Sequence, residues 1–340
     1  MPDNNISIIN LLVWKLSMKY MRKCKSICVI FISVISLLTL SSCVEYKPAL
    51  RIATNPWPGY EYLHLAEELG YFKDENIEVK LIEFLSLADA TRSFERGQVD
   101  VWGTTTVELA LSHKQSGRFA QAFYVTDISN GADKIIANKN ITHLKQLKGK
   151  KIGLEPGTVD VLMLHYALKS VGLTLSDIKQ IALPKNQLQH AFKDGLISAA
   201  CVYPPYSSSL INKGMHSLFD SSNTNGSIID VLAGDKTILA ERKEDFVAVI
   251  RAYLRAEKFA NEQPSIANRM MAKREKISID DFKSATEQIK YIAIEQQNDF
   301  LKSKGNLHHS LFNTHEALNI PVMVNEILFT NEIIKSVMTN

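Results

Sequence analysis

Strand-like and helix-like segments alternate from residue 50 onward, and this alternation limits the possible folds more than any other feature of the sequence. Residues 50–54 are strand-like, and the prolines at 56 and 58 exclude a helix from the loop that follows. Residues 60–69 then carry apolar side chains at helical spacing and are followed by a glycine. Repeated alternation of this kind predicts an α/β fold, with a mostly parallel sheet covered by helices on both faces.

The alternation falls into two blocks and a tail. The predicted strands and helices of the two blocks are 79–84, 87–96 and 99–102, then 151–154, 159–171, 178–183 and 199–203. The chain after residue 241 is almost all helical in pattern. Segments 133–138 and 221–229 separate the blocks, so we expect the chain to cross between two lobes there. A ligand cleft between the lobes would follow.

The N-terminal region has the order of an export signal. Five basic residues precede the uncharged stretch 27–40, which is about as long as a signal-peptide core and shorter than the roughly 20 residues that span a bilayer. The Leu-Ser-Ser-Cys sequence ending at Cys43 resembles the bacterial lipobox. We therefore expect a lipoprotein signal peptide over 1–42, lipidation of Cys43 and a tether over 43–49. An uncleaved N-terminal anchor is the alternative, and Met18 or Met21 are alternative starts to Met1.

Charge and cysteine content limit the function. Five of the 39 Lys and Arg residues and one of the 36 Asp and Glu residues precede Cys43, so the remainder is near neutral and offers no basic field for nucleic acid. Cys201 is the one cysteine after Cys43, which excludes an intrachain disulfide in the mature chain. No Cys and His pattern has zinc spacing, so we expect no metal and no cofactor.

Four blocks of sequence, at 70–84, 94–108, 129–137 and 147–158, resemble the substrate-binding proteins of ABC importers. The branch that they resemble binds nitrate, taurine, alkanesulfonates and thiamine-pyrimidine precursors, and the resemblance covers about residues 50–240. It implies a two-lobe fold of the periplasmic-binding-protein type II class, with two hinge crossings and a helical C-terminal tail.

The same resemblance implies the limits of the lobes and the partners of the chain. Lobe 1 would comprise 50–135 and 226–340, and lobe 2 would comprise 136–225. The protein would be an exported monomer, in the periplasm or on the outer face of the cytoplasmic membrane. There it would close on a small solute and deliver it to an ABC permease.

Five loops at strand ends are the predicted ligand contacts, because helix N-termini present free N–H groups and the positive end of the helix dipole. By their position in the family's loops, the implied contact residues are Trp57, Tyr60, Glu61, Thr104, Thr105, Glu108, Asn130, Asp133, Glu155, Gly157, Thr158 and Tyr203. The aromatic rings could stack on a planar ligand, and packing at the edge of the core is their alternative role. The threonines could instead cap helices, and Asp133 could be a solvated turn carboxylate.

The charges of these loops indicate a class of ligand. They contain no Lys or Arg, and they contain Glu61, Glu108, Asp127, Asp133 and Glu155. A site for a bare oxyanion usually recruits Arg, or many amides with no carboxylate nearby. The sequence therefore favours a neutral, amine-bearing or heteroaromatic solute, such as a thiamine-pyrimidine precursor, over nitrate, taurine or a sulfonate.

Two other functions remain open from the sequence. The same fold hosts a synthase that makes the thiamine pyrimidine, but this chain lacks the Cys-rich iron motif of that enzyme and His64 is isolated. The export signal also argues against a biosynthetic enzyme, so we expect no catalytic residues. A lipoprotein that senses a ligand without feeding an importer would use the same binding chemistry.

Overall fold

The computed structural model describes Trp14, Met18 and residues 47–319 and 328–339. The chain divides into two compact units, Met1–Pro48 and Ala49–Asn340, and every element described below belongs to the second unit. The predicted signal peptide and Cys43 lie outside the described residues, apart from Trp14 and Met18. None of the helices in the described ranges has the length and apolar character needed to span a membrane.

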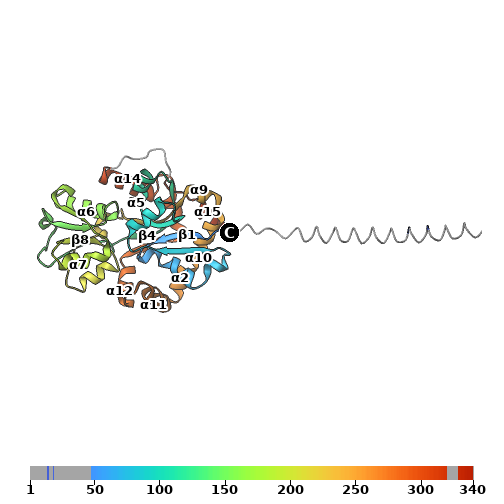
Figure 1. Ribbon diagram of the computed structural model, residues 1–340, viewed down its shortest axis with the longest axis horizontal. Coiled ribbons are helices and arrows are strands. Elements are labelled where there is room, and N and C mark those ends of the chain that lie inside the picture. Colours follow the sequence, from blue (N-terminus) through green and yellow to red (C-terminus); the bar gives the residue numbers. More distant parts are fainter. Residues whose placement is uncertain (1–13, 15–17, 19–46, 320–327, 340) are drawn as a thin grey trace, which may run out of the picture. The chain divides into compact units, whose positions relative to one another are not determined.

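Two mixed β-sheets form the centre of the second unit, one in each lobe (Figure 1). The six-stranded sheet has the order β11-β4-β10-β3-β1-β2, and the five-stranded sheet has the order β7-β6-β8-β5-β9. The first sheet comprises β1 (Leu50–Thr54), β2 (Val79–Glu83), β3 (Val101–Thr105), β4 (Ala120–Ser129), β10 (Ile229–Asp235) and β11 (Ile289–Tyr291). The second comprises β5 (Lys134–Ala137), β6 (Lys151–Leu154), β7 (Lys179–Ala182), β8 (Ala199–Val202) and β9 (His216–Asp220). The predicted α/β two-lobe fold is confirmed.

The expectation of mostly parallel sheets was wrong. β1 runs parallel to β2 and β3, and β6 runs parallel to β7 and β8, as strand–helix alternation requires. β10 is antiparallel to both β3 and β4, and β5 is antiparallel to both β8 and β9. The antiparallel pairs arise because the chain crosses between the lobes. It leaves the first lobe along β4 and returns along β10 in the opposite direction.

Helices cover both sheets. Figure 1 shows α2 and α10 on one side of the first sheet, α5 and α14 on the other, and α6 and α7 with the second sheet. The helices of the first lobe are α2 (Glu61–Glu68), α3 (Tyr71–Asp74), α4 (Leu87–Glu95), α5 (Thr106–Ser116), α9 (Lys236–Glu241), α10 (Lys243–Glu262), α11 (Pro264–Glu275), α12 (Ile279–Thr286), α13 (Gln297–Leu301), α14 (Asn306–Leu318) and α15 (Glu332–Thr339). Those of the second lobe are α6 (Val159–Lys169), α7 (Leu188–Lys193) and α8 (Tyr206–Ile211).

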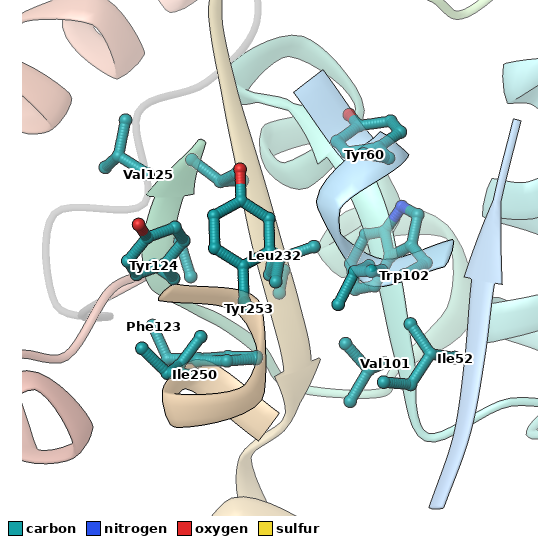
Figure 2. Close-up of a cluster of buried hydrophobic side chains, with 14 of the residues drawn as sticks. Ile52, Tyr60, Val101, Trp102, Phe123, Tyr124, Val125, Leu232, Ile250 and Tyr253 are labelled. Atoms are coloured by element: carbon teal, nitrogen blue, oxygen red, sulfur yellow. The ribbon is translucent and has the colours of Figure 1, made fainter. Parts of the chain in front are cut away.

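The core of the first lobe is rich in aromatic side chains (Figure 2). Trp102 of β3 is fully buried and stacks on Phe94 of α4, with ring centroids 3.8 Å apart. The ring of Tyr60 lies so close to Gly103 that a Cβ there would stand 2.7 Å from it. Glycine at 103 therefore lets the loop after β1 pack directly on β3, which fixes the position of that loop.

The two crossings between lobes lie side by side. The hydroxyls of Ser129 and Ser221 are 2.7 Å apart, and Ser221 also accepts a hydrogen bond from the Gly131 N–H. The first crossing was predicted too late, at 133–138, because the chain leaves β4 at Ser129 and β5 already begins at Lys134. The tail is also not purely helical, since β11 extends the first sheet.

Candidate ligand-binding site

A small buried cavity lies where the two lobes meet. Its walls are formed by residues of the strand-end loops, of the crossings and of the helix starts, namely Asn55, Trp57, Tyr60, Leu87, Thr105, Asp133, Val159, Tyr203 and Asp230. The cavity volume is about 10 Å³, which is room for about one water molecule. The lobes are thus closed in this structure, and an organic solute requires them to separate or their side chains to move.

Aromatic side chains form one wall of the cavity. The rings of Trp57 and Tyr203 meet edge to face with centroids 6.0 Å apart, although they come from different lobes. The loop that holds Trp57 is anchored from two distant elements, because Tyr253 of α10 donates to the Gly59 carbonyl at 3.0 Å and Tyr291 of β11 donates to the Pro58 carbonyl at 2.9 Å. A rigid loop of this kind keeps the indole in place for a ligand.

Three aspartates of the crossings lie at or next to the cavity, since Asp133 and Asp230 line it and Asp127 contacts the lining residue Trp57. The Trp57 Nε1–H donates to Asp127 at 3.2 Å, and the Tyr60 hydroxyl donates to Asp230 at 2.8 Å. Burial raises the pKa of Asp127 to about 7 and that of Asp133 to about 6. Burial and the charges of Asp127 and Asp133 raise the pKa of Asp230 well above its usual value. A ligand that brings N–H donors or positive charge would stabilise these carboxylates in their ionised form.

Glu108 joins the two lobes. Its Oε2 accepts hydrogen bonds from the Thr105 N–H, at 3.1 Å, and from the Thr105 hydroxyl, which closes a capping box at the start of α5. Its Oε1 accepts the Val159 N–H from the first turn of α6 at 2.6 Å. Burial raises the pKa of Glu108 to about 7, although the hydrogen bonds from Thr105 and Val159 stabilise the carboxylate and lower the pKa.

Lys185 is a buried base beside the cavity that the loop-by-loop reading of the sequence missed. Its Nζ pairs with Asp160, donates to the Cys201 carbonyl at 3.1 Å and lies 5.3 Å from the centre of the Tyr203 ring. Burial opposes its charge, but Asp160 and Glu155 outweigh burial and raise the pKa of Lys185. It follows the carboxyl end of β7, at the edge that carries the other loops, and this position was the available signal.

The predicted contact residues separate into two groups. Trp57, Tyr60, Thr105, Asp133 and Tyr203 line the cavity, together with Asn55, Leu87, Val159 and Asp230, which the prediction did not include. The remaining seven, which are not among the cavity-lining residues, are Glu61, Thr104, Glu108, Asn130, Glu155, Gly157 and Thr158.

Most residues of this second group have other partners. Glu61 is fully buried and paired with Arg274, whose Nε–H donates to it at 2.7 Å. Thr158 caps α6, and Glu155 accepts the Lys185 N–H at 3.3 Å. The Asn130 N–H donates to the Gln288 carbonyl at 2.9 Å. Their part in ligand binding therefore stays a prediction, since most of them hold the frame around the cavity.

Comparison with known proteins agrees with this architecture. The fold is similar to that of the periplasmic aliphatic sulphonate binding protein SsuA from Escherichia coli, with a TM-score of 0.65, 19% identity, and coverage of 83% of this chain and 96% of that one. It is also similar to the periplasmic nitrate-binding protein NrtA from Synechocystis PCC 6803, with a TM-score of 0.71, 11% identity, and coverage of 86% and 88%. At these identities the likeness is one of fold.

Curated relatives are similar over part of their length. A Brucella abortus (strain 2308) protein named as a binding protein is 26% identical over 183 residues, which are 49% of this chain and 54% of that one. A 4-amino-5-hydroxymethyl-2-methylpyrimidine phosphate synthase of Aspergillus parasiticus is 29% identical over 136 residues, which are 38% of each chain. The chain thus spans about half the length of the first of these relatives. The model of the NMT1-like family matches residues 45–274, and the chain therefore belongs to the NMT1-like family.

Proposed function

We propose that this protein is the solute-binding component of an ABC-type importer and that it captures a small organic solute by closing its two lobes. The observation that carries the proposal is the cavity between the lobes, which combines aromatic walls with buried carboxylates. The likeness of the fold to periplasmic binding proteins supports it. A ligand that contacts both lobes favours the closed state over the open one.

The charge of the cavity supports an amine-bearing or heteroaromatic solute, such as a thiamine-pyrimidine precursor, over a sulfonate, taurine or nitrate. The base that sequence analysis missed, Lys185, is paired with Asp160. Among the described ion pairs, none involves Asp127, Asp133 or Asp230. The side chains available to a ligand are therefore acidic, and Trp57 and Tyr203 offer faces for a flat ring.

Export and anchoring belong to the same proposal. The basic and apolar N-terminal stretch, with Cys43 after Leu-Ser-Ser, supports a lipid anchor that keeps a monomeric binder close to a membrane permease. We propose lobe limits of 50–135, 136–225 and 226–340, with hinges at the paired crossings around Ser129 and Ser221. A sensing role without transport uses the same site and differs only in its partner.

We propose no enzymatic activity, although some relatives are named as synthases. His64, the candidate that sequence analysis weighed, interacts with the Thr54 hydroxyl at 3.0 Å and is not among the residues that line the cavity. Burial, and then the Arg274 charge, lower the pKa of His64 to about 3, so it stays neutral. A neutral imidazole held in this way is suited to packing, not to proton transfer at the cavity.

Identification of a co-purifying solute tests the proposal most simply. The chain from Val44 onward, without Cys43, is purified without denaturation and its small molecules are analysed by mass spectrometry. We expect an amine-bearing or heteroaromatic compound that rebinds with compaction in small-angle scattering. A tight ligand that leaves the scattering unchanged would refute lobe closure.

A further inference from the structure

The starts of two helices from different lobes meet at one carboxylate. Glu108 Oε2 accepts the Thr105 N–H at the N-terminus of α5, and its Oε1 accepts the Val159 N–H at the N-terminus of α6. Both helices have eleven residues, and Glu108 is fully buried. Because helix N-termini attract anions through free N–H groups and the helix dipole, two of them facing one point form a strong anion position.

The first turn of α6 shows that Glu108 completes this position. The Asp160 N–H donates to the Thr158 hydroxyl, and the Val161 N–H donates to the Thr158 carbonyl at 3.1 Å. The amide of Val159 has neither of these local partners, and it points to Glu108 in the other lobe. A carboxylate of this chain thus binds where an oxyanion from outside would otherwise find a free amide.

Two unpartnered polar side chains indicate that a ligand enters beside this position. Asn55 Oδ1 and Asp230 Oδ2 have no hydrogen-bond partner among the described residues, and both side chains are more than nine-tenths buried. They line the same cavity as Thr105 and Val159, the two residues whose amides Glu108 accepts. A buried polar atom without a hydrogen-bond partner destabilises the fold. Such atoms are expected in a binding site, where a ligand supplies the missing partner.

Resting on the proposed solute-binding function, we propose that Glu108 is a specificity determinant that excludes oxyanions from the site. Its carboxylate takes the place of a sulfonate, nitrate or phosphate group between α5 and α6. A second anion there would meet both its volume and its charge in a poorly solvated space. The solute that binds must therefore use the neighbouring Asp133 and Asp230 through donor groups.

A second glutamate lies near a helix start of the other lobe. Burial raises the pKa of Glu155 of the second lobe and the Ala88 N–H, in the first turn of α4, lowers it, but Glu155 Oε2 has no hydrogen-bond partner among the described residues. Glu108 is the better test of the two, because Lys185 lies next to Glu155 and complicates its charge.

Calorimetric titration with methanesulfonate at pH 8 tests the proposal, since Glu108 is ionised there. The full chain is compared with E108A, which removes volume and charge, and with E108Q, which removes charge alone. E68A is the matched control, because Glu68 lies exposed on α2. We expect E108A to bind methanesulfonate at least about tenfold more tightly than wild type, which is about 1.4 kcal/mol. E108Q should fall between them, and E68A should match wild type.

Thermal unfolding first establishes that the variants fold. If E108A does not fold, the test rests on E108Q, which keeps the size of the side chain. Equal methanesulfonate affinity in wild type, E108Q and E108A would overturn the role of Glu108. The proposed function would survive that result if a solute still co-purifies with wild type. Conversely, a gain of methanesulfonate binding in the variants would support the role of Glu108 even if no natural solute is recovered.

Discussion

Two clusters of buried carboxylates in the first lobe differ in one respect, namely whether a cation accompanies them. In the first, Arg274 of α11 pairs with Glu61 and Glu275 and donates to Glu83 at 2.6 Å. In the second, Asp127 and Asp230 have hydrogen bonds from Trp57 and Tyr60 but no ion pair among the described residues. We infer that the first cluster stabilises the fold and that the second is available to a ligand.

The difference matters because both clusters carry a cost of burial. Burial raises the pKa of Glu275 to about 9 even beside Arg274, with the Glu61 charge as the next cause. A buried carboxylate without a cation is destabilising unless it is protonated or a ligand provides donors. Buried carboxylates that have no cation partner are therefore candidates for ligand binding. Carboxylates in a complete ion-pair cluster need no role beyond stabilising the fold.

Removal of Arg274 should have the largest effect. R274M keeps an apolar side chain but leaves Glu61 buried without its cation, so we expect a loss of about 3–5 kcal/mol in the free energy of unfolding. Denaturant unfolding measures it. The control is R255M, because the pair between Arg255 and Asp74 is 40% and 56% exposed, and its loss should cost about 1 kcal/mol or less. Equal losses in the two variants would remove the contrast between the clusters.

Neutralising Asp230 should affect binding and spare stability. In D230N the amide can still accept from Tyr60, but the charge offered to a donor-bearing solute is lost. We expect the affinity for the co-purified solute to fall by about 1.5–3 kcal/mol, the worth of a hydrogen bond to a charged group. Calorimetry measures it, with the exposed Asp280→Asn as control. If D230N unfolds more readily but binds the solute with normal affinity, Asp230 has a structural role and does not bind the ligand.

The pH dependence of stability should reveal the carboxylates without cations. The pKa of Asp127 is raised to about 7 and that of Asp133 to about 6, so the folded state holds protons that the unfolded state has released. The contribution of these two groups to the free energy of unfolding is therefore fully present below about pH 4. It is lost as the pH rises through their folded-state pKa values of about 6 and 7.

D127N should recover on the order of 1 kcal/mol of this loss at pH 8. Melting temperatures measured between pH 5 and pH 8 follow it, and D280N should keep the slope of wild type. If D127N and wild type lose stability in parallel, then Asp127 is ionised in the folded protein at low pH and the comparison is wrong for that residue.

The smallest effect is expected at the exposed edge of the contact between lobes. The Tyr206 hydroxyl donates to the Leu85 carbonyl of the other lobe at 3.1 Å, in an exposed position. Because water can replace this bond, Y206F should weaken solute binding by about 0.5 kcal/mol, which is roughly twofold. The Tyr203 hydroxyl, in contact with Asn55 and buried, provides the contrast. If Y206F and Y203F weaken binding equally, burial does not distinguish the two contacts.

The sequence predicted part of the fold and about half of the residues that line the cavity. The resemblance to a family implied Trp57, Thr105 and Tyr203, which do line the cavity. Strand periodicity located β1, β2, β3, β6, β7 and β8, but it did not predict β4, β5 and β9, which flank the crossings. It also did not predict β11, which has three residues and is stabilised by pairing with β4. Short segments of this kind depend on tertiary contacts.

The separation of the two carboxylate clusters lay beyond the sequence for a similar reason. Glu61 and Arg274 are 213 positions apart, and the sequence around Glu61 does not predict this ion pair. Asp230 reaches the cavity because β10 returns between β3 and β4, a pairing that no local pattern encodes. The opposite charges of Lys185 and Asp160 were visible, but their contact required the second lobe to be folded.

A single competition between ligands of opposite character tests the central claim most directly. An aminopyrimidine, a polyamine, taurine and an alkanesulfonate are titrated into the protein at pH 8 by calorimetry under one set of conditions. The closed, cation-poor cavity with Glu108 at its helix starts predicts tight binding of an amine-bearing or heteroaromatic probe and no measurable binding of the alkanesulfonate. Tight binding of the alkanesulfonate alone would contradict this account of the site.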